Sequence, residues 1–237
     1  MKKLLSIAVC VSAVAAFATE VPVSLGEVGV TAVSSSTTNT VIAVSYTDLA
    51  SDGNITASNL VKTANLAVGD RLYVYDSGDF KAFVLAASGD VKYWQGTATA
   101  EPNDGVASVT AATSADNVRV AVGTGVWLVR SSGWDGEPFS FYIYGKPVDS
   151  LSSVSVSGSA LVGNPTQTSK SPTFTSGPAD NDKIVIPYAN KTGTQIWTYS
   201  SSKGKWGITP SDLHSTAPAI PAGTGFWYVG TATFNWN

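Results

Sequence analysis

The side chains that could bind a small molecule gather on one short stretch. Trp134 stands in the segment RSSGWDGEP, with Asp135 and Glu137 beside it. A sugar ring stacks its apolar face on an exposed aromatic ring, and nearby carboxylates accept hydrogen bonds from its hydroxyl groups. These three residues are the ligand-binding site that we predict, with carbohydrate as the ligand class. A tryptophan on a loop tip can instead be tucked beneath its own loop, and the sequence leaves both alternatives open.

The sequence offers few groups for catalysis. His214 is the only histidine, and it lies in the proline-rich segment PSDLHSTAPAIP. A nucleophilic serine of the hydrolase type would stand in a G-x-S-x-G turn, which does not occur in the chain. Glycoside hydrolysis needs two positioned carboxylates, but no spacing singles out Glu101 and Glu137 as such a pair. We therefore predict no catalytic residues, and a protein that is not an enzyme.

Three acidic turns could supply oxygen ligands to calcium. They are DSGD, with Asp76 and Asp79, then EPNDG, and DNDK, which contains Asp182. None of them matches the calcium loop of twelve residues with its terminal glutamate. Aspartate, asparagine and glycine are also the residues that tight turns need. We predict no metal and no cofactor, and we assign Asp70 and Asp182, which recur at equivalent positions, to capping a turn or strand.

The first 18 residues have the organisation of a secretory signal peptide. Lys2 and Lys3 precede an apolar run over residues 4–16, which is too short to span a bilayer, and Ala-Phe-Ala then offers small residues to a signal peptidase. We predict cleavage after Ala18 and no membrane span in the mature chain. Cys10 is the only cysteine and leaves with the leader, so the mature chain has no disulfide. The predicted location is secreted or at the bacterial cell surface.

The charge of the chain argues against a nucleic-acid partner. The 14 basic and 17 acidic residues give a net charge of −3, and the loss of Lys2 and Lys3 makes it −5. Charged residues are only 13% of the chain and no basic run occurs, whereas phosphate binding needs clustered lysine and arginine. We predict that the protein binds no nucleic acid.

Composition and hydrophobic periodicity both favour strands. Ser, Thr, Val, Gly and aromatic residues dominate, while the residues that favour helices are scarce. Leu72 and Val74 alternate with Tyr73 and Tyr75, a period of two that gives a strand one apolar face. No window of ten or more positions keeps the helical period. The predicted fold class is all-β, with about 12–14 strands.

The chain reads as two copies of one unit. Residues 69–94 align with residues 181–206 at an offset of 112 without a gap. The element Gly-Thr-Gly-x-Trp recurs at residues 123–127 and 223–227, an offset of 100, so the first copy carries 12 additional residues before it. Large aromatic side chains are core residues more often than binding sites. We therefore assign the recurring tryptophans to the lobe cores: Trp94, Trp127, Trp206 and Trp227.

This alignment predicts two tandem, internally duplicated lobes, each a β-sandwich or barrel-like unit. A signal peptide occupies residues 1–18. A first β lobe, with extra N-terminal strands and a loop insertion, occupies residues 19–148, and a second β lobe occupies residues 149–237. The segment GKPVDS is the expected boundary between the two lobes in the sequence.

Three functions are compatible with these features. The leading one is an exported, non-catalytic β-repeat protein with a structural or interaction role at the cell surface or outside the cell. The alternative is a carbohydrate-binding protein that uses Trp134, with Trp236 and Tyr142 or Tyr144 as secondary candidates. A further alternative is an outer-membrane β-barrel. The predicted partners are a glycan, or another protein through edge strands, including self-assembly. The edges that we suspect are VPVSLGEVGVTAV and TATFNWN.

Overall fold

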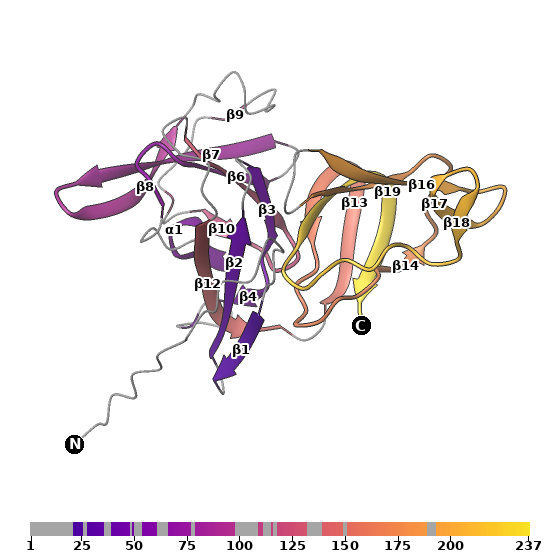
Figure 1. Cartoon of the computed structure of the whole chain (residues 1–237), viewed down its shortest axis with the longest axis horizontal. Coiled ribbons are helices and arrows are strands. Elements are labelled where there is room, and N and C mark those ends of the chain that lie inside the picture. The colour runs from indigo at the N-terminus through magenta and orange to yellow at the C-terminus, as the bar shows by residue number, and fades with distance from the viewer. Residues whose placement is uncertain are drawn as a thin grey trace.

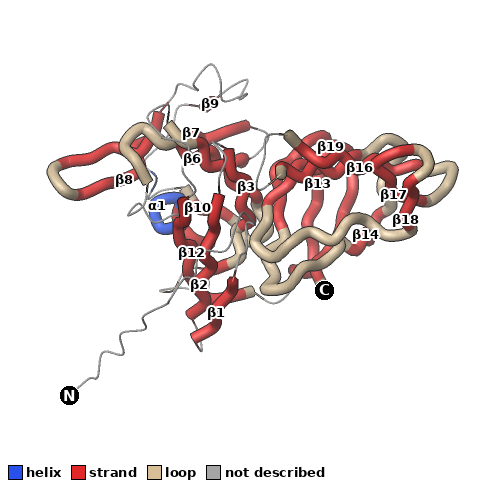
Figure 2. Tube along the Cα trace, viewed as in Figure 1, coloured by secondary structure: helices blue, strands red, loops and turns tan. Residues whose placement is uncertain are grey.

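The structure is a computed structural model of the chain, and it is built almost entirely from β-strands (Figure 1, Figure 2). It describes residues 21–25, 28–35, 39–47, 49, 54–60, 66–76, 79–97, 109–110, 115, 118–131, 139–148, 151–188 and 193–237. Within them lie nineteen strands and the short helix α1 (Ala57–Leu60). The all-β fold class is thereby confirmed. The strands outnumber the 12–14 expected, and four contain two residues only: β4 (Tyr46–Thr47), β5 (Ile55–Thr56), β9 (Val109–Thr110) and β10 (Arg119–Val120).

The first lobe, as we call the described residues before Leu151, holds three sheets. Its longer strands are β1 (Val21–Leu25), β2 (Val28–Ser35), β3 (Asn39–Ala43), β6 (Arg71–Asp76), β7 (Asp79–Ser88), β8 (Val91–Thr97), β11 (Gly125–Val129) and β12 (Phe139–Pro147). The main sheet has the order β3-β11-β6-β7-β8, with β9 also beside β7. A second sheet has the order β1-β2-β12-β4, and β5 pairs with β10.

The second lobe, from Leu151 to the C-terminus, holds one sheet of seven strands. They are β13 (Leu151–Gly163), β14 (Thr173–Ser176), β15 (Lys183–Pro187), β16 (Thr194–Ser200), β17 (Lys205–Thr209), β18 (Asp212–His214) and β19 (Gly225–Trp236). Their order is β13-β19-β15-β16-β17-β18, with β14 also beside β19. In the described residues none of the sheets closes on itself, so the lobes resemble sandwiches.

The two lobes follow the same strand order. The main sheet of the first lobe, β3-β11-β6-β7-β8, corresponds strand by strand to β13-β19-β15-β16-β17. The strands β2, β12 and β4 of its second sheet correspond to the first part of β13, the last part of β19, and β14. In the second lobe, β13 and β19 therefore run through both layers as single strands. They bend where Gly158 lies opposite Gly230, and both glycines have positive φ, 88° and 146°. Only glycine adopts such angles readily, which allows the two strands to turn together.

The register corrects one detail of the ungapped alignment. Val84 pairs with Arg71 in the first lobe, whereas the residue opposite the equivalent Lys183 is Thr198. Val84 therefore corresponds to Thr198 and not to Ile196, because the first hairpin is two residues longer in the second lobe. The next hairpin is two residues shorter, so the tryptophans that end the two aligned segments still occupy equivalent positions.

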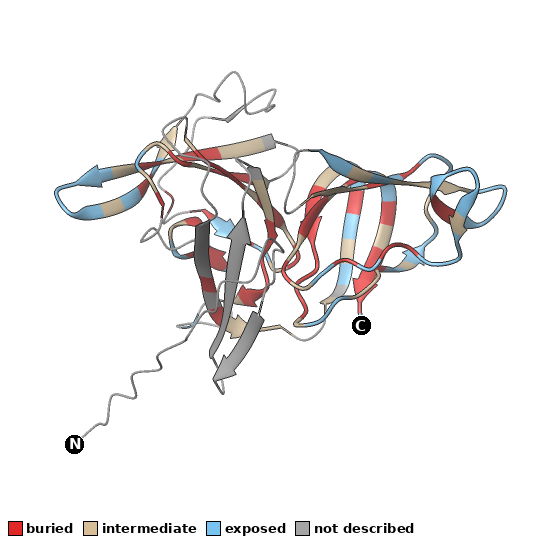
Figure 3. Cartoon of the chain, viewed as in Figure 1, coloured by how far each residue is buried: buried red, intermediate tan, exposed pale blue. Residues whose placement is uncertain are grey.

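Each lobe has its own hydrophobic core between its strand layers (Figure 3). Trp94 and Trp206 are buried in these cores, as predicted, with 5% and 2% of their surface exposed. Other large core side chains are Leu72, Phe83 and Leu128 in the first lobe, and Ile184, Phe226, Tyr228 and Phe234 in the second. The period-two alternation of each strand aims these residues inward.

The two suspected sheet edges have different outcomes. VPVSLGEVGVTAV contains β1, which is an edge strand of its sheet, as predicted. TATFNWN forms the end of β19, which pairs with β13 on one side and β14 on the other. The prediction of an edge there is wrong, because both sides of this strand already carry backbone hydrogen bonds.

Candidate interaction site at the junction of the two lobes

Each Gly-Thr-Gly element forms the tight turn that begins a central strand. The N–H of Gly123 donates to the carbonyl of Val44, and the N–H of Val44 donates to the carbonyl of Thr124, both at 2.9 Å. The second lobe repeats both hydrogen bonds at the equivalent positions, at 3.0 and 3.1 Å. Gly123 and Gly223 have φ of 82° and 64°, a conformation that glycine adopts without steric cost. The turn thus explains the first glycine of each element.

Each turn also bonds to the opposite lobe. The N–H of Ala43 donates to the carbonyl of Gly223 at 2.6 Å, and the N–H of Gly163 donates to the carbonyl of Gly123 at 2.9 Å. Two isolated antiparallel bridges show the same reciprocity: Ile42 with Thr224, and Val162 with Thr124. Exchanging the lobes converts each contact into the other, so the junction has the pattern of a two-fold interface.

The last glycine of each element is required by this close approach. A Cβ on Gly125 would lie 2.7 Å from Cγ of Leu161 in the second lobe. A Cβ on Gly225 would lie 2.9 Å from the carbonyl oxygen of Ile42 and closer still to the side chain of Val41 in the first lobe. A side chain at either position would overlap the opposite strand. The recurrence of Gly-Thr-Gly therefore has a steric explanation at the junction.

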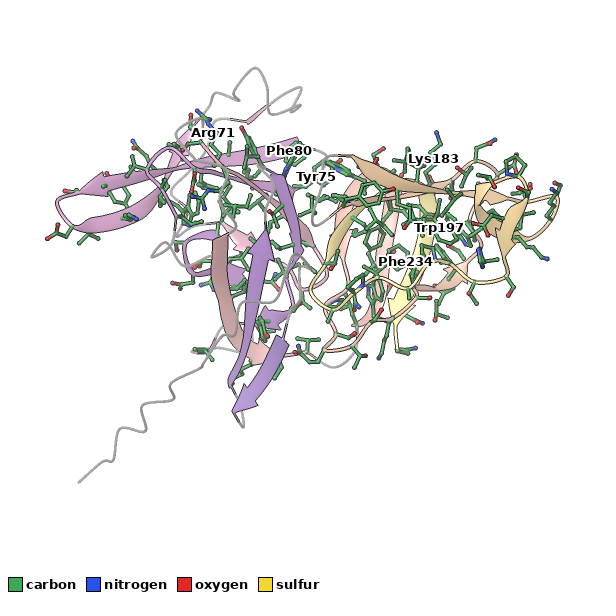
Figure 4. All side chains as sticks on the ribbon, in the orientation of Figure 1. Arg71, Tyr75, Phe80, Lys183, Trp197 and Phe234 are labelled. Atoms are coloured by element: carbon green, nitrogen blue, oxygen red, sulfur yellow. The ribbon has the colours of Figure 1, made fainter. Side chains whose placement is uncertain are left out.

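An aromatic cluster spans the junction, and we call it the junction cluster: Tyr73, Tyr75, Phe80, Trp127 and Trp227. The Phe80 ring is central, with centroids 5.7 Å from Trp227, 6.5 Å from Trp127 and 5.2 Å from Tyr75. The Tyr75 hydroxyl donates to the carbonyl of Ser159 in the second lobe at 2.7 Å. Figure 4 shows Tyr75 and Phe80 where the first lobe faces the second.

The position of Trp127 and Trp227 corrects the sequence prediction. Both were expected in the lobe cores, but both are half-buried on the outer face of their sheets. Val126 and Leu128 are fully buried on the inner face, and the alternation of side chains places Trp127 on the other face. Neither tryptophan lies inside a core. Trp227 packs against Tyr75 and Phe80 of the opposite lobe, whereas Trp127 packs against Phe80 within its own lobe. The Trp227 ring meets Phe80 edge to face at 74°, and the Trp127 ring is tilted against Phe80 at 59°.

The predicted carbohydrate site lies outside the described residues. Trp134, Asp135 and Glu137 belong to the segment between β11 and β12, whose described ends are Ser131 and Phe139. The site is neither supported nor contradicted by the geometry, and it stays a prediction.

The secondary aromatic candidates are resolved only in part. Trp236 is fully buried, with its ring centroid 6.1 Å from that of Phe226. It is therefore a core residue, and its prediction as a ligand contact is wrong. The side chains of Tyr142 and Tyr144 lie outside the described residues.

The recurring aspartates cap equivalent turns, as predicted. Oδ2 of Asp70 accepts a hydrogen bond from the N–H of Ala67 at 2.8 Å. Oδ2 of Asp182 accepts one from the N–H of Ala179 at 3.0 Å. Both carboxylates are buried, so each hydrogen bond offsets part of the cost of removing a charge from water.

The two capped turns differ in their remaining partners. In the first lobe, Nε of Arg130 lies 3.2 Å from Oδ2 of Asp70, and both side chains are buried. In the second lobe the position of this arginine is taken by Gly230, where a Cβ would collide with Asp182. Tyr228 donates to Asp182 instead, at 2.8 Å. Burial, the hydrogen bond and the negative charge of Asp182 raise the pKa of Tyr228 far above its usual range, so the phenol stays protonated.

Of the other acidic turns, the structure describes the side chains of DNDK only. Oδ1 of Asp180 accepts hydrogen bonds from the N–H and the hydroxyl of Ser201, at 2.8 and 3.0 Å. The side chains of Asp76 and Asp79 and the segment EPNDG lie outside the described residues. Across the described ranges, no three His, Cys, Asp or Glu side chains are grouped to hold a metal ion.

His214 lies on the surface in β18. Its Nε2 is 2.9 Å from Oδ1 of Asp212, and its ring centroid is 5.2 Å from that of Trp197. Both members of the pair are about half exposed, at 49% and 51%. An ion pair at such exposure contributes little to stability.

Sequence alone did not identify Tyr75 and Phe80 as junction residues. Both flank the DSGD turn in the sequence, and both pack against Trp227 of the second lobe. The sequence does contain one difference that could have indicated this contact. The second lobe has Pro187 at the position of Tyr75, and Thr194 at the position of Phe80. An aromatic pair that one copy carries and the other lacks indicates a contact particular to that copy.

Comparison of the chain with protein-family models, curated proteins and solved structures gives no match. The part of the chain that the structure describes contains no helix of the length and apolarity that crossing a membrane requires.

Proposed function

We propose that this is an exported, non-catalytic β-repeat protein with a structural or interaction role at the bacterial cell surface or outside the cell. The observation that carries the proposal is the reciprocal junction, in which each Gly-Thr-Gly turn bonds to the opposite lobe. It joins the two lobes through backbone hydrogen bonds and closely packed glycines. A body held in this way suits a protein that presents surfaces to partners.

The repeated unit belongs to the same proposal. The lobes share a strand order, equivalent turns and equivalent aspartate caps. We infer that one β unit was duplicated, and that the contact between the copies descends from a symmetric pair of units. The residues that differ between copies are then the ones that serve partners.

The polar groups of the described residues support a structural role. The buried Asp70 holds a turn and faces Arg130, and the buried Asp182 holds a turn and binds Tyr228. Asn164 is also buried, and its amide donates to the carbonyls of Thr168 and Ile220, both at 2.8 Å. These groups are occupied by the backbone and by one another.

Export is supported by the leader-like sequence of residues 1–18. The test is to purify the native protein from its own cells after fractionation, and to determine its N-terminus by mass spectrometry. We expect a chain that begins at Thr19 and is found in the surface or extracellular fraction. A cytosolic chain that begins at Met1 would contradict the proposal.

Carbohydrate binding is the second candidate. It is favoured by the half-burial of Tyr75, Phe80, Trp127 and Trp227, which leaves part of each ring in contact with solvent. The edge-to-face and tilted packing of these rings is weaker support than a flat aromatic surface would be. We therefore place this function after the structural role, and we keep Trp134 as its principal residue.

A further inference from the structure

The outer face of the main sheet is covered in one lobe and open in the other. Tyr73 and Ala82 of the first lobe are fully buried on this face, and Val129 is 7% exposed. In the second lobe the register places Val185, Ile196 and Val229 at the same positions. Ile196 is 45% exposed, Val229 is 38% exposed and Val185 is half-buried. Figure 3 shows exposed residues on the upper sheet of the second lobe.

The same contrast holds for the strand edge beside this face. In the first lobe β9 pairs with β7 in parallel, with Phe80 opposite Val109 and Lys81 opposite Thr110. The equivalent residues of the second lobe are Thr194 and Gln195 of β16. In the described residues these two pair with β15 on one side only, because β17 joins β16 from Thr198 onward. The backbone groups of the other side form an available edge.

In the first lobe, β9 shows what kind of segment pairs with this sheet edge. β9 belongs to the part of the first lobe that is longer by 12 residues, and among the described residues of the second lobe no strand takes the equivalent place beside Thr194 and Gln195. Residues 106–114, VASVTAATS, are rich in valine, alanine and threonine and carry no charge. Such residues favour an extended conformation on a half-buried surface.

The open face also continues into an existing contact. Trp227 pairs directly with Val185, and Val185 pairs directly with Ile196, so the three form one row across β19, β15 and β16. Trp227 packs against Tyr75 and Phe80 at the junction. An apolar strand added beside Ile196 would therefore extend the apolar surface that already joins the lobes.

We propose that the β16 edge at Thr194–Ile196 of the second lobe binds an uncharged, valine- and threonine-rich extended segment of a partner protein by β-strand addition. The backbone N–H and C=O groups of Thr194 and Ile196 point away from β15, and hydrogen bonds to them give the affinity. Contact with the side chain of Ile196 selects apolar side chains. This inference rests on the proposed interaction role and names the chemistry of the partner.

The test uses a fluorescent synthetic peptide of residues 106–114, titrated into the full chain and followed by fluorescence anisotropy. Ile196→Lys places a charge on the open face, and Val91→Lys is the matched control, since Val91 is 66% exposed on β8 of the first lobe. A second peptide with N-methyl groups at alternate residues removes backbone donors and keeps the side chains. We expect saturable binding of the peptide to the wild type and to the Val91→Lys control. For Ile196→Lys, and for the methylated peptide with the wild type, we expect the dissociation constant to rise by about tenfold or more.

Two results would overturn the inference. One is the absence of saturable binding to the wild type. The other is equal binding by wild type and Ile196→Lys, which would mean that the peptide binds elsewhere, for example by displacing β9 from the first lobe. Neither result bears on the location and N-terminus of the native protein, so failure of this inference is distinguishable from failure of the proposed function.

Discussion

Ala43 donates its backbone N–H to the carbonyl of Gly223 across the junction, and the equivalent Gly163 donates to Gly123 in the reverse direction. Interfaces with this reciprocity normally form between identical subunits. Here both halves belong to one chain, and the lobes approach so closely that glycine is needed at two further positions, Gly125 and Gly225. The junction therefore tolerates little added volume at these two positions.

Gly225→Ala should destabilise the protein. The added Cβ would lie 2.9 Å from the carbonyl oxygen of Ile42, so one strand must shift. We expect a loss of about 1–3 kcal/mol of unfolding free energy, measured by urea denaturation. Gly177→Ala is the control, because a Cβ there meets nothing within 4 Å. Equal stability of the two variants would show that the junction tolerates a wider separation.

Phe80 and Trp227 should be energetically coupled across the junction. Their ring centroids are 5.7 Å apart at an interplanar angle of 74°. A double-mutant cycle with Phe80→Ala and Trp227→Ala should give a coupling free energy of about 0.5–1.5 kcal/mol. Additive losses would mean that each ring packs only within its own lobe.

Arg130→Met should be strongly destabilising, because it leaves the fully buried Asp70 without the positive charge beside it. The expected loss is about 3–5 kcal/mol of unfolding free energy. Lys205→Met, at an exposed position of β17, serves as the control and should change stability little. A loss for Arg130→Met as small as that of the control would refute the pairing.

Tyr228→Phe tests the second capped turn and its pH dependence. Loss of the hydroxyl removes one hydrogen bond to the buried Asp182 and should cost about 1–3 kcal/mol at neutral pH. The pKa of Tyr228 is raised in the folded protein, whereas an unfolded tyrosine titrates near pH 10. Above about pH 10 unfolding therefore releases a proton, and the wild type loses stability as pH rises.

The variant lacks this group, so the stability difference between wild type and Tyr228→Phe should narrow above about pH 10. Urea denaturation between neutral pH and pH 11 measures it. Tyr93→Phe, at a residue that is 45% exposed, is the control and is measured over the same pH range. A difference for Tyr228→Phe that stays constant or widens with pH would contradict the assignment.

The period-two pattern predicted strands well, since Leu72 and Val74 are buried on one face as expected. It did not predict which aromatic residues are core residues. Recurrence between the two halves predicts interior packing, and this is confirmed for Trp94 and Trp206. Trp127 and Trp227 lie instead on the outer faces of their sheets, where Trp227 packs against the other lobe. Such a contact depends on how the lobes are placed relative to each other. Local sequence carries no signal for that placement.

Trp134→Ala tests the carbohydrate alternative. If Trp134 contacts sugar, the variant should lose retention on a glycan array while its melting temperature stays that of the wild type. Trp236→Ala is the opposite control, because Trp236 is fully buried and its truncation should cost about 3–5 kcal/mol. If Trp134→Ala lowers the melting temperature and leaves glycan retention intact, Trp134 is a packing residue.

The reciprocal junction has a consequence for dilute surroundings. Two separate subunits with these contacts would dissociate once their concentration fell below the dissociation constant. The peptide linkage between the lobes keeps the effective concentration of each half at the other high, on the order of millimolar for a short tether. The assembled pair therefore persists at any dilution, without a disulfide and without a second chain.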